Sequence, residues 1–147
     1  SLTINSLGHM YDDEQRAREQ LVEIEMFLQN SKKQIRSYKL PVISEKYFTE
    51  LNEANDAIKE VIKELEKKPI VIETLNIRVD TARDLVLKLY NTTLEMVKTA
   101  RLAEATIVYG NRFRSSYQNV DSNLTEARKL FYKGNYKKSL DTSLRII

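Results

Sequence analysis

One long apolar stripe between Ile70 and Ser115 constrains this chain more than any other feature. Apolar or small residues recur there at alternating steps of three and four, at Ile72, Leu75, Val79, Ala82, Val86, Leu89, Thr93, Met96, Ala100, Ala103 and Ile107. The spacing predicts one helix with a continuous seam, since no proline or glycine interrupts it before Gly110. Such a helix is about 70 Å long, too long for one compact core. We therefore expect its two halves to pack in two successive bundles.

The composition indicates an all-α protein. Glycine (3) and proline (2) are scarce, and charged residues make up 31% of the 147 residues. Cysteine is absent, which excludes disulfides and thiolate metal sites. The net charge is only +3, with both signs mixed along the chain, so we expect no nucleic-acid partner. No apolar run approaches the length of a membrane span.

The first ten residues, Ser1–Met10, read differently from the rest. Gly8-His9-Met10 looks like a cloning remnant, and we set this segment aside. It holds the only histidine, so the remaining chain has neither histidine nor cysteine. Bundle enzymes of the di-iron type need Glu-x-x-His pairs. We therefore expect no enzymatic activity, no metal and no cofactor.

Residues 11–90 are expected to form a first three-helix bundle. A helix over residues 11–38 carries the seam Ala17, Leu21, Ile24, Leu28, Ser31, Ile35 and Tyr38. Leu40-Pro41 ends it, because proline disfavours the α conformation in the residue before it. Ser44 is a plausible N-cap for a helix to Glu66, with Phe48 and Ile62 widening the seam Tyr47, Leu51, Ala54, Ile58, Val61 and Leu65. Pro69 suits the first position of the long helix.

Residues 91–147 are expected to form a second bundle on the far half of the long helix. Asn119 or Asp121 is expected to cap a fourth helix that runs to Lys133, with inward residues Val120, Leu124, Ala127 and Leu130 or Phe131. Gly134-Asn135 predicts a tight turn, and a fifth helix from about Tyr136 carries the apolar residues Leu140, Leu144 and Ile147. The run 127–140 also resembles a tetratricopeptide helix-turn-helix. An alternative function is therefore a tetratricopeptide-like peptide-binding adaptor, although no repeat of about 34 residues is present.

Two stretches carry a more specific resemblance. Residues 99–115 read TARLAEATIVYGNRFRS, and residues 130–136 read LFYKGNY. Together they resemble the C-terminal region of the EzrA family, the septation ring formation regulators of Gram-positive bacteria. The resemblance implies spectrin-like repeats, so we expect an all-α fold of two consecutive spectrin-like three-helix bundles sharing one long central helix.

The same resemblance implies a function. It implies a non-catalytic scaffold that binds the tubulin-like division protein FtsZ, restrains FtsZ-ring assembly and contacts other division and cell-wall synthesis proteins. It also implies a single N-terminal membrane anchor, absent from this sequence. The chain would then lie on the cytoplasmic face of the membrane at the division septum, with stiff bundles holding a binding patch at a distance from the anchor. Formation of homo-oligomers is left open.

The family has a characteristic patch, Gln-Tyr-Gly-Asn-Arg-Tyr-Arg, associated with placement at mid-cell. The resemblance assigns partner binding to the matching residues here, Tyr109, Gly110, Asn111, Arg112, Phe113 and Arg114, while Val108 replaces the glutamine. Arginine forks suit carboxylates, and rings at i and i+4 form one aromatic surface. A purely structural reading stays open: the glycine ends the helix, the arginines neutralise its dipole and the rings cap the bundle.

A second candidate surface is basic. Cations outnumber acids after Glu126, where the sequence places Arg128, Lys129, Lys133, Lys137, Lys138 and Arg145 against Asp141. Such a surface could face anionic lipid or an acidic protein. The alternative is the solvated face of a helical hairpin.

Overall fold

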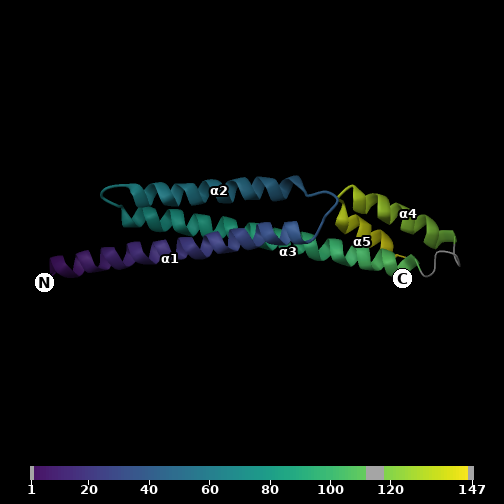
Figure 1. Ribbon diagram of the computed structural model, residues 1–147, viewed down its shortest axis with the longest axis horizontal. Helices are drawn as coiled ribbons and strands as arrows, with labels where there is room; N and C mark the ends of the chain where they lie inside the picture. Colours follow the sequence, from purple (N-terminus) through teal and green to yellow (C-terminus); the bar gives the residue numbers. More distant parts are fainter. Residues whose placement is uncertain (1, 112–117, 146–147) are drawn as a thin grey trace. The chain divides into compact units, whose positions relative to one another are not determined.

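The computed structural model describes the backbone of residues 2–111 and 118–145, and the side chains of residues 12–111 and 122–145. Every regular element in these ranges is a helix (Figure 1), which confirms the all-α prediction. The helices are α1 (Leu2–Ser37), α2 (Glu45–Glu66), α3 (Ile72–Gly110), α4 (Gln118–Tyr132) and α5 (Tyr136–Leu144). Their contacts divide the chain into two compact units, one of Ser1–Lys32 and Lys46–Asn91, the other of Lys33–Glu45 and Thr92–Ile147.

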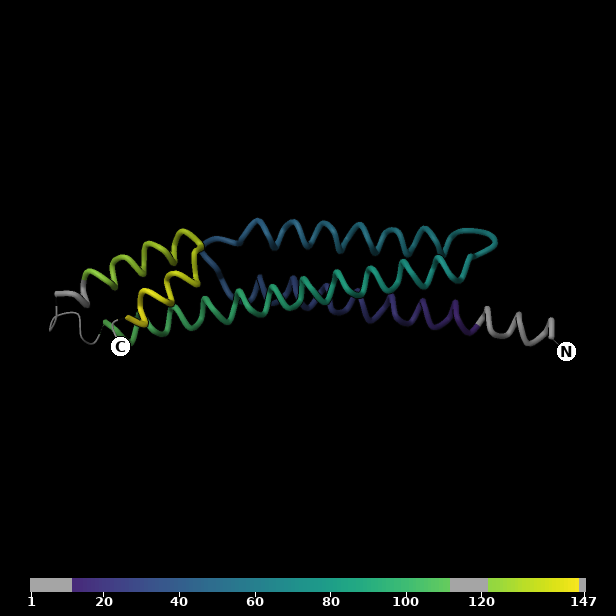
Figure 2. Tube along the Cα trace, turned by 180° about the vertical axis from the view of Figure 1, so that it is seen from behind, coloured from purple at the N-terminus to yellow at the C-terminus, as the bar shows by residue number. Residues whose placement is uncertain are grey.

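Unit 1 is built from α1, α2 and the first part of α3, which lie side by side (Figures 1 and 2). The predicted stripes of α1 and α3 are largely confirmed, because most of their members in this unit are buried: Ala17, Ile24, Leu28, Ser31, Leu75, Val79, Ala82, Val86 and Leu89. Leu21 and Ile72 are only half-buried, and farther along α3 the buried residue is Val97 where the sequence predicted Met96. The hydroxyl of Ser31 donates to the Phe27 carbonyl at 3.1 Å, which satisfies it within its own helix. Each apolar stripe is thus buried by the other helices of the unit.

Three boundaries differ from those expected. Helix α1 begins at Leu2, within the segment set aside as a remnant. Helix α3 begins at Ile72, so Pro69 lies in the connection and not in the first turn. Helix α4 begins at Gln118, before both of the predicted caps, Asn119 and Asp121. The other end of α3, which the sequence left open, is Gly110, and residues 112–115 lie outside the described residues.

The buried face of α2 is rotated from the predicted one. Tyr47, Ala54, Ile58 and Val61 are buried as expected, but Leu51 and Leu65 are only half-buried, and Phe48 and Ile62 are exposed. Their places in the core are taken by Glu50, Ala57 and Glu64, each a step of three after a buried residue. The hydropathy pattern does not predict this buried face, because two of these three positions carry carboxylates.

The two buried glutamates are not equivalent. One oxygen of Glu64 accepts from the Lys67 ammonium at 2.9 Å. Glu50 is 3% exposed, and neither of its carboxylate oxygens has a hydrogen-bond partner among the described residues. A buried carboxylate without partners carries its full desolvation penalty. Glu50 is therefore the least favourable side chain in the core of unit 1.

Replacing Glu50 by leucine should stabilise the protein. The change Glu50→Leu removes the unpartnered carboxylate and adds apolar volume to the core, so we expect the free energy of unfolding to rise by about 1–3 kcal/mol. The matched control is Glu53→Leu, an exposed position on the same helix, which should change it by less than about 0.5 kcal/mol. Urea unfolding followed by circular dichroism measures both. A destabilised Glu50→Leu variant would mean that the carboxylate has a partner in solution.

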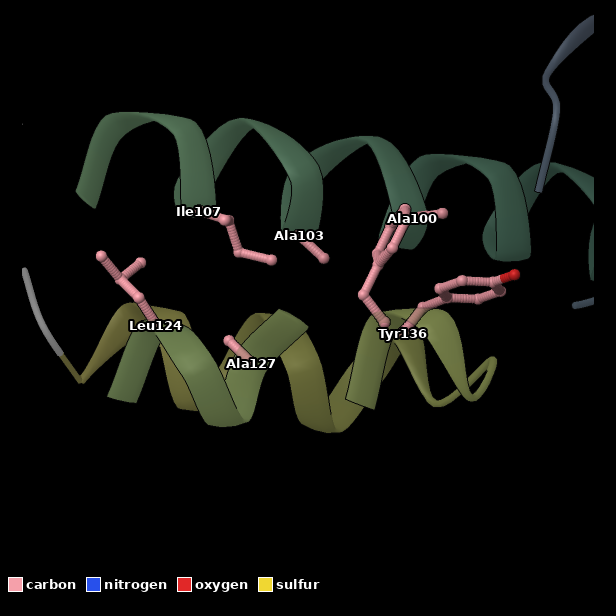
Figure 3. Packing of buried hydrophobic residues seen from close by; sticks show 7 residues of the cluster. Ala100, Ala103, Ile107, Leu124, Ala127 and Tyr136 are labelled. Atoms are coloured by element: carbon pink, nitrogen blue, oxygen red, sulfur yellow. The ribbon is translucent and has the colours of Figure 1, made fainter. Parts of the chain in front are cut away.

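Unit 2 buries the second part of α3 against α4 and α5. Its core consists of Ala100, Ala103, Ile107, Leu124, Ala127, Phe131 and Tyr136, and Figure 3 shows the α3 residues facing those of the other two helices. The inward positions Leu124, Ala127 and Phe131 of α4 are confirmed. Val120 lies outside the described side chains.

Residues 33–45 belong with this unit by their contacts, although the sequence placed them in the first bundle. Tyr38 and Leu40 explain the difference, because both pack against the core of unit 2. The spectrin-like arrangement of the two units stays a prediction.

The inner face of α5 differs from the predicted stripe of leucines. Leu140 packs partly against the core, but Leu144 is 51% exposed, and Ile147 lies outside the described residues. The buried residues of α5 are instead Tyr136, Ser139, Thr142 and Ser143. The Ser139 hydroxyl donates to the Ala127 carbonyl at 2.7 Å, so small polar side chains satisfied by backbone let α5 approach α4 closely.

The predicted turn at Gly134-Asn135 is confirmed, and it has a second role. Gly134 has φ of +87°, and the amides of Gly134 and Asn135 donate to the carbonyls of Phe131 and Leu130, a Schellman ending of α4. A Cβ at Gly134 would lie 2.8 Å from the Cβ of Val42. The Tyr136 hydroxyl donates to the carbonyl of Val42 and accepts from its amide at 3.1 Å. The hairpin of α4 and α5 thus holds the α1–α2 connection at Val42.

Gly134 should tolerate no side chain. The change Gly134→Ala imposes the left-handed conformation on alanine and drives its Cβ into Val42, so we expect a loss of about 2 kcal/mol or more in the free energy of unfolding. The double variant Gly134→Ala/Val42→Gly removes the clash and keeps the backbone cost. Measured against Val42→Gly alone, it should recover part of the loss. Equal losses in both backgrounds would show that the close approach to Val42 costs nothing.

Candidate functional site

The predicted binding residues begin at the C-terminal end of α3. Tyr109 and Gly110 form its last two positions and Asn111 follows, whereas Arg112, Phe113 and Arg114 lie outside the described residues. Tyr109 is 43% exposed and Gly110 is buried. The side-chain oxygen of Asn111 is buried without a hydrogen-bond partner in the described part of the chain. The ring of Tyr109 is therefore partly open to solvent, whereas Gly110 is buried and Asn111 is half-buried.

Val108 stands where the family pattern has a glutamine, and it is 61% exposed. Its neighbours on the same face of α3 are Glu104 and Ala105, which are also exposed. An amide at this position would meet solvent or a partner, not the core. Val108 makes this part of the surface apolar here.

The structure adds Tyr38 to the candidate site, whereas the sequence placed this residue only in the apolar stripe of the first helix. The Tyr38 hydroxyl donates to a carboxylate oxygen of Glu104 at 2.5 Å, and the Arg101 guanidinium lies 5.1 Å from the centre of the Tyr38 ring. A hollow of about 480 Å³ joins this group to the predicted patch, lined by Tyr38, Arg101, Glu104, Ala105, Val108 and Tyr109. The candidate site is this lining together with the patch, and we call it the α3-end site.

The signal for Arg101 and Glu104 is present in the sequence, because they share one exposed face of α3 with Ala105 and Val108 at steps of three and four. No signal indicates Tyr38. It reaches the site because residues 33–45 pack in unit 2, which is a tertiary contact between residues 66 positions apart.

The pKa of Tyr38 reports on this arrangement. Burial, and next the hydrogen bond to the Glu104 carboxylate, raise the pKa of Tyr38 from 10.0 to about 12. Both causes favour the protonated hydroxyl, which is the form that donates to Glu104. Burial also raises the pKa of Tyr136, whose hydroxyl holds Val42.

Tyr38 should be the tyrosine that reveals the site in an alkaline titration. Because its folded pKa lies above the unfolded value of 10.0, the stabilisation is complete below pH 10 and is lost as the pH rises through about 12. Absorbance of tyrosinate should show a component near pH 12 that Tyr38→Phe removes. Glu104→Gln should shift that component to lower pH, and Tyr132→Phe, on α4, should leave it in place. A titration curve that Tyr38→Phe leaves unchanged near pH 12 would refute the pairing.

The basic surface is divided between two helices. Arg128, Lys129 and Lys133 are exposed on or just after α4, and Lys137 and Lys138 are exposed on α5. Helices α4 and α5 close against each other and against α3 through the contacts of Figure 3. The inner surface that a tetratricopeptide-like module would offer to a peptide is thus occupied by the unit's own core.

The described residues hold neither a metal-ligand cluster nor a membrane-spanning helix. Searched over these residues, the structure contains no group of three or more histidine, cysteine, aspartate or glutamate side chains that could hold a metal ion. Within the same residues, no helix combines the length and the apolar character that a bilayer crossing needs.

Fold and site together define a helical-bundle protein with a surface patch of tyrosine and charged side chains at the end of a long helix. Residues 3–147 match the family described as septation ring formation regulator, EzrA. The chain therefore belongs to the EzrA family. The match also includes most of the segment Ser1–Met10 that was set aside.

Curated relatives agree with this assignment. The chain is 33% identical over 128 residues to the septation ring formation regulator EzrA of Geobacillus sp. (strain WCH70), covering 87% of this chain and 23% of the relative. It is 37% identical over 124 residues to EzrA of Geobacillus kaustophilus, covering 84% and 22%. EzrA of Staphylococcus epidermidis is 26% identical over 141 residues, covering 93% and 24%. The chain thus spans about a quarter of these relatives. No solved structure matches it significantly.

Proposed function

We propose that this chain is part of a non-enzymatic regulator of cell division that binds FtsZ and restrains assembly of the FtsZ ring. Family membership supports the regulatory role, since the relatives carry the name septation ring formation regulator. Following the resemblance, the protein acts at the septum on the cytoplasmic face of the membrane, held by an anchor outside this sequence. Other division and cell-wall synthesis proteins are further partners.

The observation that carries the proposal is the position of Tyr109. It is partly exposed at the end of α3, directly before the segment with Arg112 and Arg114, and shares a hollow with Tyr38 and Glu104. Tyrosine and arginine are the residue types that most often dominate binding energy at protein interfaces. Arginine forks pair with carboxylates in two parallel hydrogen bonds, which suits the acidic partner that the resemblance implies.

The test is sedimentation of FtsZ polymers with and without this chain. The wild type should lower the amount of pelleted polymer. Arg112→Ala/Arg114→Ala should lose this effect, because each substitution removes one guanidinium group from the patch. We expect a loss in affinity on the order of ten-fold or more. The melting temperature of the double variant should stay that of the wild type.

A matched control separates position from charge. Arg16→Ala/Arg18→Ala removes two exposed arginines at the same spacing from α1 in unit 1, and it should retain the effect on FtsZ. Equal losses in both double variants would mean that the effect on FtsZ depends on net charge and not on the position of the arginines. An unfolded Arg112→Ala/Arg114→Ala variant would assign these side chains to the fold, as the structural reading holds.

A further inference from the structure

The most exposed large hydrophobic side chain of the described residues is Tyr132, at the C-terminal end of α4. It is 68% exposed, and its ring meets the ring of the core residue Phe131 edge to face, with centroids 5.5 Å apart. An aromatic ring held in this way loses little conformational entropy when a partner covers it. Tyr132 is thus a rigid apolar projection from an otherwise charged helix face.

Tyr132 lines two hollows, and Arg128 borders each of them. One, of about 410 Å³, lies between α4, the end of α3 and the α1–α2 connection, and its lining includes Lys39, Pro41, Glu104 and Val108. The other, of about 500 Å³, lies along α4 and is lined by Thr125, Arg128, Lys129, Tyr132 and Lys133. All of these residues belong to unit 2. We call this surface the Tyr132 ridge.

The ridge carries unbalanced positive charge. Lys39, Arg128, Lys129 and Lys133 are exposed, and none of them has an acidic partner within 4 Å in the described part of the chain. Among the described residues that line the two hollows, one is acidic, Glu104, and it lines the hollow that reaches the end of α3. Its carboxylate already accepts a hydrogen bond from the Tyr38 hydroxyl. The complement of this surface is therefore an anionic ligand.

The shape and the apolar lining distinguish between anionic ligands. A lipid surface needs cations on one plane, whereas here Lys39 and Arg128 border a hollow that also has apolar walls. Pro41 and Val108 give one hollow apolar walls above the buried ring of Phe131. Such hollows accept apolar side chains, while the cations around them pair with carboxylates.

We propose that the Tyr132 ridge binds an acidic segment of a partner protein in which carboxylates alternate with apolar side chains. Apolar residues of that segment enter the hollows beside Tyr132, and its carboxylates meet Arg128 and the three lysines. The ridge shares Glu104 and Val108 with the α3-end site but has neither Tyr109 nor Gly110 in its lining, so this inference does not rest on the proposed binding of FtsZ.

The test uses a fluorescein-labelled synthetic peptide in which glutamates alternate with leucines, titrated with the 147-residue chain and followed by fluorescence anisotropy. The wild type should bind it, with an affinity that falls as salt is raised. Tyr132→Ser and Arg128→Gln should each weaken binding on the order of ten-fold. Arg78→Gln, which removes an exposed arginine from unit 1, should bind as the wild type does.

Three comparisons make the test decisive. A peptide of alternating glutamates and serines has the same charge and should bind more weakly, because it cannot fill the hollows. Vesicles containing phosphatidylserine should not compete; competition that depends on Arg128 would overturn the proposal in favour of a lipid surface. Lack of binding by the wild type, or equal binding by Tyr132→Ser, Arg128→Gln and Arg78→Gln, would also overturn it. Both ridge residues are exposed, so circular dichroism should show folded variants.

Discussion

The apolar stripe of α3 is the constraint on which both units depend. From Leu75 to Ile107 its buried positions follow one another at steps of three or four, and each unit buries its own part of that stripe. In unit 1, α1 and α2 both pack against the first part of the stripe. In unit 2, α4 and α5 both pack against the second part. An amphipathic helix is stable in water only when its apolar face is covered, so the length of α3 requires partners along its whole stripe.

The two units cover the stripe by different means. Unit 1 uses long helices with apolar faces and tolerates an unpartnered carboxylate at Glu50. Unit 2 has short helices, and α5 contributes small polar residues whose hydroxyls bond to backbone carbonyls. A nine-residue helix cannot bury much apolar area. The contacts of Gly134 and Tyr136 with Val42 supply what that helix lacks, because they hold the connecting segment over the core.

Sequence reasoning reached the stripes of α1 and α3 and the turn at Gly134, because apolar periodicity and glycine chemistry are local signals. It missed the register of α2, where Glu50 and Glu64 occupy core positions that no hydropathy rule assigns to carboxylates. It also missed Tyr38 as a site residue, since its contact with Glu104 joins distant parts of the chain. Of the patch that the family resemblance indicated, the structure describes Tyr109, Gly110 and Asn111, which are exposed, buried and half-buried respectively.

Val108 and Glu104 link the two surfaces of unit 2, because both residues line the hollow beside Tyr109 and the hollow beside Tyr132. The Glu104 carboxylate is engaged by Tyr38, so it is less available to repel an acidic ligand on either side. Val108 contributes exposed apolar surface where the family pattern has an amide. A ligand that reaches across this boundary therefore gains contact area at Val108 without having to replace a hydrogen bond to water. The departure from the family pattern thus favours ligands with an apolar side chain at this point of the surface.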